Sequence, residues 1–95
     1  MNVTWHLRIS GRVQGVGFRA ALQFEAQANG ISGWVRNRRD GTVEAVVQGN
    51  PQAIEKILAW ARRGPPIAHV ATVDARPADC ELDQPYAGFD QLPTA

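Results

Sequence analysis

The chain has 95 residues, of which 44% are hydrophobic and 20% are charged, and its net charge is +1. This composition excludes an intrinsically disordered chain and fits one compact domain over residues 1–95. The single cysteine, Cys80, excludes an internal disulfide, and the first residues resemble neither a signal peptide nor a membrane span. We therefore expect a cytoplasmic monomer with no membrane partner.

The first part of the chain predicts a strand, a helix and a second strand. Apolar and polar residues alternate over residues 3–10, which is the period of a half-buried strand. A helix is expected from Phe18 onward, because apolar residues recur there at every fourth position, and Asn29-Gly30 is typical of its end. Residues 31–37 form the second predicted strand.

The second part predicts a hairpin, a helix and a further strand. Asp40-Gly41 is typical of a tight hairpin turn, and residues 42–49 form the strand that follows it. Asn50-Pro51 indicates a helix start that extends to about Arg63. Residues 68–76 alternate again and predict a fourth strand.

This order of elements predicts the fold class. A β-α-β-β-α-β order indicates an α+β, ferredoxin-like sandwich, with an antiparallel sheet and two helices on one face. In that topology the first two strands end at the same edge of the sheet. The glycine-rich loop after the first strand should therefore lie beside Asn37, which ends the second strand.

The loop between the first strand and the first helix, "GRVQGVGFR" at residues 11–19, has the features of an anion site. Glycine-rich turns at a helix start expose backbone N–H groups that no helical turn satisfies, and the helix dipole adds positive potential. Arg19 in the first turn opposes that dipole unless an anion lies between them. Taken alone, a glycine-rich loop is more often only a tight connection, with Arg19 extending into solvent, because short glycine motifs match widely by chance.

Charge is unevenly distributed along the chain. Residues 1–39 carry six arginines and one acid, a net charge of +5, whereas residues 40–95 carry four bases and eight acids, a net charge of −4. This asymmetry is compatible with an anionic ligand for the first half, or with chance clustering on a solvated surface. We expect Arg12, Arg36 and Arg38 to be surface residues rather than catalytic ones.

Two motifs carry a family resemblance. "GRVQGVGFR" at 11–19 resembles the first signature of the acylphosphatases, and "GWVRNRRDGTV" at 33–43 resembles the second. The resemblance extends over roughly residues 5–75. It implies hydrolysis of the carboxyl–phosphate bond of acyl phosphates, with an acyl phosphate as substrate and inorganic phosphate as product. It implies no cofactor and no metal.

The resemblance also assigns site residues. Matching the motifs makes Arg19 and Asn37 the catalytic residues, with Asn37 orienting the attacking water. Position alone favours the interpretation of Asn37 as an ordinary turn residue before Asp-Gly, and the motif match together with the expected proximity to the loop reverses that preference. The resemblance places the phosphate on Gln14, Gly15, Val16, Gly17, Phe18 and Arg19.

Two alternative functions share features with this sequence. A catalytically silent binding or regulatory module, as found within larger hydrogenase-maturation proteins, has the same fold, but Arg19 and Asn37 favour an enzyme. An RNA-recognition domain has the same element order, but the strand at 42–49 has no aromatic residue on which bases could stack, so we expect no nucleic-acid partner.

The C-terminal residues depart from the family pattern. Gln91 occupies a position where a second apolar residue of the last strand is expected. Pro93 and the weak alternation around it predict at most a short edge strand there. This departure concerns the sheet edge and does not involve the phosphate loop.

Overall fold

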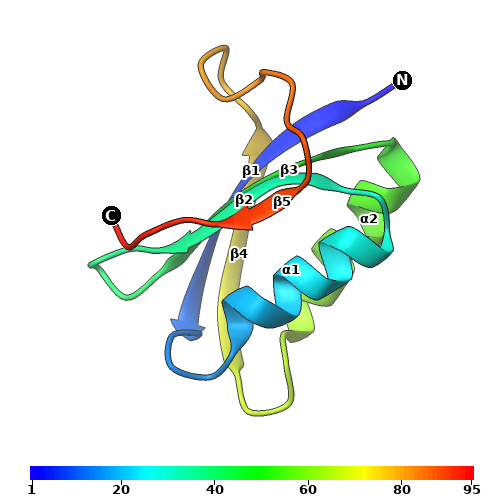
Figure 1. Cartoon of the computed structure of the whole chain (residues 1–95). Coiled ribbons are helices and arrows are strands. Elements are labelled where there is room, and N and C mark those ends of the chain that lie inside the picture. The colour runs from blue at the N-terminus through cyan, green and yellow to red at the C-terminus, as the bar shows by residue number, and fades with distance from the viewer.

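The computed structural model describes all residues from Met1 to Ala95 and has two helices and five strands (Figure 1). Their order confirms the predicted β-α-β-β-α-β pattern, with a fifth strand added, and the predicted bounds shift only slightly at their ends. The elements are β1 (Val3–Arg12), α1 (Phe18–Ala28), β2 (Ser32–Asn37), β3 (Val43–Gly49), α2 (Pro51–Arg63), β4 (His69–Pro77) and β5 (Phe89–Gln91).

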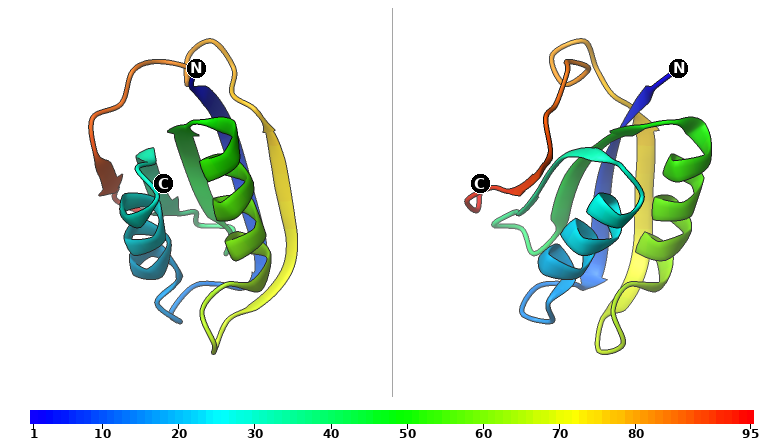
Figure 2. Two further views of the ribbon diagram at one scale, coloured as in Figure 1. Left: turned by 90° about the vertical axis from the view of Figure 1, so that its right-hand side faces the viewer. Right: turned by 45° about the vertical axis from the view of Figure 1, so that its right-hand side comes forward.

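The five strands form one sheet in the order β4-β1-β3-β2-β5. The first four strands pair in antiparallel fashion, whereas β5 runs parallel to β2. The predicted antiparallel pairing of the first four strands is confirmed, and the added β5 makes the whole sheet a mixed one. The physical reason is visible in Figure 2, where the chain after β4 crosses one end of the sheet and then runs alongside β2 in the same direction.

Both helices lie on one face of the sheet and leave the other face uncovered (Figure 2). The alternation along β1 explains this arrangement, since Leu7 and Ile9 are buried under the helices while His6 and Arg8 lie on the uncovered face and remain half-exposed. Neither α1 nor α2 has the length and apolar character that crossing a membrane requires.

The second helix begins as the sequence predicts. The Asn50 side chain accepts a hydrogen bond of 2.7 Å from the backbone N–H of Ala53, and Pro51 takes the first helical position. Such a cap contributes about 1 kcal/mol to helix stability. The cap therefore defines where α2 begins, directly after β3.

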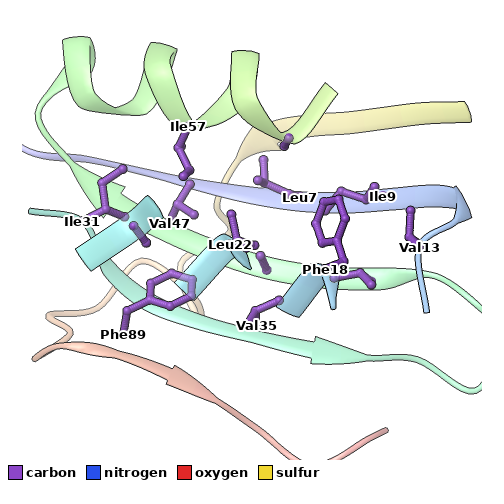
Figure 3. Close-up of a cluster of buried hydrophobic side chains, with 14 of the residues drawn as sticks. Leu7, Ile9, Val13, Phe18, Leu22, Ile31, Val35, Val47, Ile57 and Phe89 are labelled. Atoms are coloured by element: carbon purple, nitrogen blue, oxygen red, sulfur yellow. The ribbon is translucent and has the colours of Figure 1, made fainter. Parts of the chain in front are cut away.

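The hydrophobic core fills the space between the helices and the sheet (Figure 3). Phe18 and Leu22 of α1 and Ile57 of α2 are almost completely buried. The Phe18 ring also packs at a tilt against Trp60, with 5.4 Å between the ring centroids. Full burial of such a side chain contributes about 2 kcal/mol. The first residue of α1, next to Arg19, is therefore firmly anchored.

The departure at Gln91 is compensated by a polar contact. The Gln91 side chain donates a hydrogen bond of 2.9 Å to Gln23 on α1, and Gln23 in turn donates one of 2.8 Å to the carbonyl of Phe89. Phe89 itself is only 2% exposed. A short edge strand forms here, at a place where the sequence left its presence open, although the usual second apolar residue is replaced.

Candidate active site

The loop from β1 to α1 presents an unbroken series of free backbone amides. The N–H groups of residues 14–20 donate no hydrogen bond within the chain. Helix α1 has no side-chain cap and no acidic residue in its first turn. Val13 and Val16 are buried and hold the loop on the core at two points. These features form a rigid, electropositive cradle of the kind that binds phosphate.

Gly15 and Gly17 are required by the backbone conformation of this loop. Their φ angles are 73° and 79°, in the left-handed region that side chains other than glycine's disfavour. A Cβ atom at either position would meet no atom within 4 Å, so crowding by the protein is not the reason for glycine. The space over the loop is open to a ligand.

Arg19 stands at the start of α1 without a counter-charge from the protein. It is half-buried and takes part in none of the ion pairs of the chain. A guanidinium in the first turn of a helix is disfavoured by the helix dipole. An anion bound in the cradle would offset this unfavourable interaction, because the helix dipole and the Arg19 guanidinium would both attract the anion.

Asn37 ends β2 on the face of the sheet that carries the helices. Its backbone is held on both sides, by pairing with Val43 of β3 and by a hydrogen bond of 3.1 Å from the N–H of Ala95 to its carbonyl. Its side chain makes no hydrogen bond within the chain, and Oδ1 is buried without a partner. Because buried polar atoms are normally paired, this amide is available for a group from outside the protein.

The predicted proximity of the loop and the end of β2 is observed. The Gln14 side chain reaches from the loop to the β2–β3 hairpin and donates hydrogen bonds to the carbonyls of Arg38 and Thr42, at 2.7 and 2.9 Å. Arg38 directly follows Asn37. The structure therefore brings the loop that precedes Arg19 together with the strand end that bears Asn37.

Comparison with known proteins identifies the family of this fold and site. The acylphosphatase family model matches residues 5–91. The chain belongs to the acylphosphatase family. It is 52% identical over 88 residues to an acylphosphatase of Thiobacillus denitrificans, a match covering 93% of this chain and 94% of that protein. It is 55% identical over 91 residues to an acylphosphatase of Azoarcus, covering 93% of this chain and 87% of that protein.

A solved structure agrees with this assignment. The acylphosphatase of Coxiella burnetii superimposes with a TM-score of 0.89 at 32% sequence identity, over 96% of this chain and 93% of that one. The resemblance first seen in two motifs therefore holds across almost the whole length of the chain.

The uncovered face of this acylphosphatase has a charge cluster that was not predicted. Glu44, the second residue of β3, is buried and lies within ion-pair distance of four basic side chains, those of His6, Arg8, Arg36 and Arg38. Its carboxylate lies 2.6 Å from Nε2 of His6, 2.8 Å from Nε of Arg36 and 3.3 Å from Nη1 of Arg38. Arg36 and Arg38 flank Asn37 along the chain, so the cluster holds the end of β2 from the face opposite the candidate site.

Burial alone would favour the neutral form of the Glu44 carboxyl. The hydrogen bonds from Arg36 and His6 outweigh that effect, and they hold the pKa of Glu44 below its ordinary value of 4.5. The ionised form is therefore stabilised in the folded protein. This contribution is complete above pH 4.5 and is lost as the pH falls through the lowered pKa.

Replacement of Glu44 by glutamine is expected to lower the free energy of unfolding by about 2 kcal/mol at pH 7, because charged hydrogen bonds are lost. Urea unfolding of the unchanged protein and of Glu44→Gln at several pH values measures this difference in the free energy of unfolding. The difference between them should shrink as the pH falls below 4.5. A difference that stays constant down to pH 3 would contradict the assigned ionisation, whatever its size.

The uncovered face also has a hollow of about 410 Å³, away from the candidate site. Part of its charged lining is paired within the protein, most clearly through the two hydrogen bonds between Arg76 and Asp74. No group of three His, Cys, Asp or Glu side chains in the chain gathers as metal ligands. The hollow is lined by His6, Arg8, Asp74, Arg76, Pro77 and Asp79.

Proposed function

We propose that residues 14–19 and Asn37 form the catalytic centre with which this acylphosphatase hydrolyses acyl phosphates. The observation that carries the proposal is the convergence of unpaired groups. Free loop amides, an arginine without a counter-ion and an asparagine side chain without a partner all lie at one end of the sheet. Buried polar atoms in a folded protein normally have a hydrogen-bond partner within the protein, and Oδ1 of Asn37 is a buried atom that has none.

The phosphoryl group would be bound by the loop. The amides of residues 14–19 point fixed dipoles at its oxygens, and the forked guanidinium of Arg19 donates to two of them at once. Such groups are most effective when they are held in place before the reaction. The buried Val13, Val16 and Phe18 supply that rigidity.

Beyond phosphate binding, the reaction requires only a correctly placed water molecule. Water attacks phosphorus, the bond from phosphorus to the acyl oxygen breaks, and a carboxylate leaves with the bonding electrons. The water proton passes to a phosphoryl oxygen, so the products are a carboxylate and dihydrogen phosphate. Because a carboxylate is a good leaving group, neither a protein acid nor a metal is needed to assist its departure.

Asn37 would orient the attacking water. An amide can accept a hydrogen bond from water through Oδ1 and donate one through Nδ2, and so hold the water in line with the bond that breaks. The unpartnered Oδ1 supports this role.

Hydrolysis of benzoyl phosphate by the purified protein tests the proposed function. We expect rapid formation of benzoate and inorganic phosphate in equal amounts, with a rate unaffected by EDTA. A folded protein that fails to hydrolyse benzoyl phosphate would instead support the silent binding or regulatory module. Activity that disappears with EDTA would overturn the metal-free mechanism.

We also propose that residues 1–95 act as one domain and that the protein is a cytoplasmic monomer. A single core shared by both helices and the sheet supports the first statement. The unpaired, exposed Cys80 is compatible with a reducing compartment. Sedimentation equilibrium would test the oligomeric state, and an observed dimer would refute the monomer.

A further inference from the structure

The two halves of the proposed site come from different parts of the chain. The phosphate cradle belongs to the loop before α1, whereas Asn37 belongs to the end of β2. In-line attack requires the water and the phosphorus to be held at a fixed separation and angle. A displacement of about 1 Å between such halves can lower a rate 100-fold. A contact within the protein must therefore hold the phosphate loop and Asn37 at a fixed relative position.

Gln14 is the one loop side chain that is hydrogen-bonded to the hairpin. Its Nε2 donates to the carbonyl of Arg38 at 2.7 Å and to the carbonyl of Thr42 at 2.9 Å, which face each other across the two strands of the hairpin. Gln14 thus joins the loop to both sides of the turn between β2 and β3, directly beyond Asn37.

The hairpin end is itself well ordered. The N–H of Arg38 donates to the carbonyl of Thr42 at 2.8 Å, and the N–H of Gly41 donates to the carbonyl of Arg38 at 3.1 Å. The Asp40 side chain accepts from the N–H of Thr42 at 3.0 Å and from its hydroxyl at 2.6 Å. Each carbonyl therefore receives its second hydrogen bond from Gln14, and the contact joins two rigid parts.

These contacts limit what the Gln14 side chain can do for a ligand. A side-chain amide has two N–H donors, and both are used on the hairpin. Its remaining oxygen is an acceptor and would repel a phosphoryl oxygen. Within the cradle, Gln14 can therefore contribute its backbone N–H only.

We infer that Gln14 is a positioning residue, which sets the geometry between the phosphate cradle and Asn37. The inference rests on the proposed function, because it assigns those two roles. Loss of the side-chain amide would leave the cradle amides and Arg19 intact, since Val13 and Val16 still anchor the loop. It would, however, free the loop to shift relative to the end of β2.

The test compares Gln14→Met, which keeps the length of the side chain and removes the donors, with the unchanged protein. For benzoyl phosphate we expect kcat to fall about 10- to 100-fold through lost alignment, while the Kd for inorganic phosphate changes less than about threefold. Gln14→Ala is measured in parallel, because the smaller side chain cannot crowd the space between loop and hairpin. Gln48→Met is the matched control, since Gln48 also donates two hydrogen bonds, to Thr4 and Gln84, outside the site.

A double-mutant cycle separates positioning from a general effect on folding. In an Asn37→Ala background, Gln14→Met should lower kcat by less than about threefold, because the group it positions is already absent. Equal losses in both backgrounds would overturn the inference. So would an unchanged kcat, or a phosphate affinity that falls in step with kcat. Absence of hydrolysis by the unchanged protein would instead be the failure of the proposed function, on which the inference depends.

Discussion

Replacement of Arg19 by alanine is expected to lower kcat/KM for benzoyl phosphate by at least about 10³-fold, the usual effect of removing an arginine from a transferring phosphoryl group. The same change should weaken binding of inorganic phosphate, because the guanidinium contacts the phosphate before, during and after the reaction. Stability should hardly change, since Arg19 has no ion pair within the chain to lose. Steady-state kinetics and calorimetric phosphate titration measure the two effects.

Two further variants determine what Arg19 contributes. Arg12→Ala removes a positive charge just before the loop and should leave kcat nearly unchanged, because Arg12 is an exposed residue at the end of β1. Arg19→Lys keeps the charge but removes the planar fork, and it should still bind phosphate poorly. Near-normal activity in Arg19→Lys would show that charge alone is sufficient and would contradict the forked contact.

Replacement of Asn37 by alanine should have a different signature. We expect kcat to fall by about 10² to 10³-fold, as on removal of a group that orients a reactant, while phosphate binding persists. The unfolding free energy should stay the same or rise, because the variant removes a buried oxygen that has no partner. A large loss of turnover without a loss of stability would assign Asn37 to the reaction rather than to the fold.

The opposite pattern would refute this role for Asn37. If Asn37→Ala unfolds easily yet retains its turnover, the residue serves the hairpin turn, as its place before Asp40-Gly41 also allows. Weakened phosphate binding with normal turnover would likewise overturn the assignment, since it would place Asn37 among the phosphate ligands. Chemical denaturation and kinetics on the same preparation separate these cases.

Local patterns in the sequence were sufficient to predict most of the fold. The alternation along β1, the turn at Asp40-Gly41 and the helix start at Asn50-Pro51 all involve neighbouring residues, so each predicted its own element. The topology then brought the loop and Asn37 together. Their roles in binding and in orienting water remain predictions, which the unpaired groups support.

The parts that could not be predicted depend on contacts between residues distant in sequence. Gln14 and the hairpin it contacts are separated by more than 20 residues, and nothing in the first motif indicates where its side chain points. Glu44 did carry a signal, as an acid in an otherwise apolar strand, but its basic partners come from two other strands and the hairpin. The pairing of Gln91 with Gln23 is likewise visible only in three dimensions.

The most direct test of the proposed site is a titration of the ¹⁵N-labelled protein with inorganic phosphate, followed through the backbone amide signals. We expect the signals of residues 14–20 to move together and saturate in the unchanged protein, and barely to move in Arg19→Ala. Signals that move instead around the hollow lined by Arg76 and Asp74, or equally in both proteins, would contradict the claim that this loop and Arg19 hold the phosphoryl group.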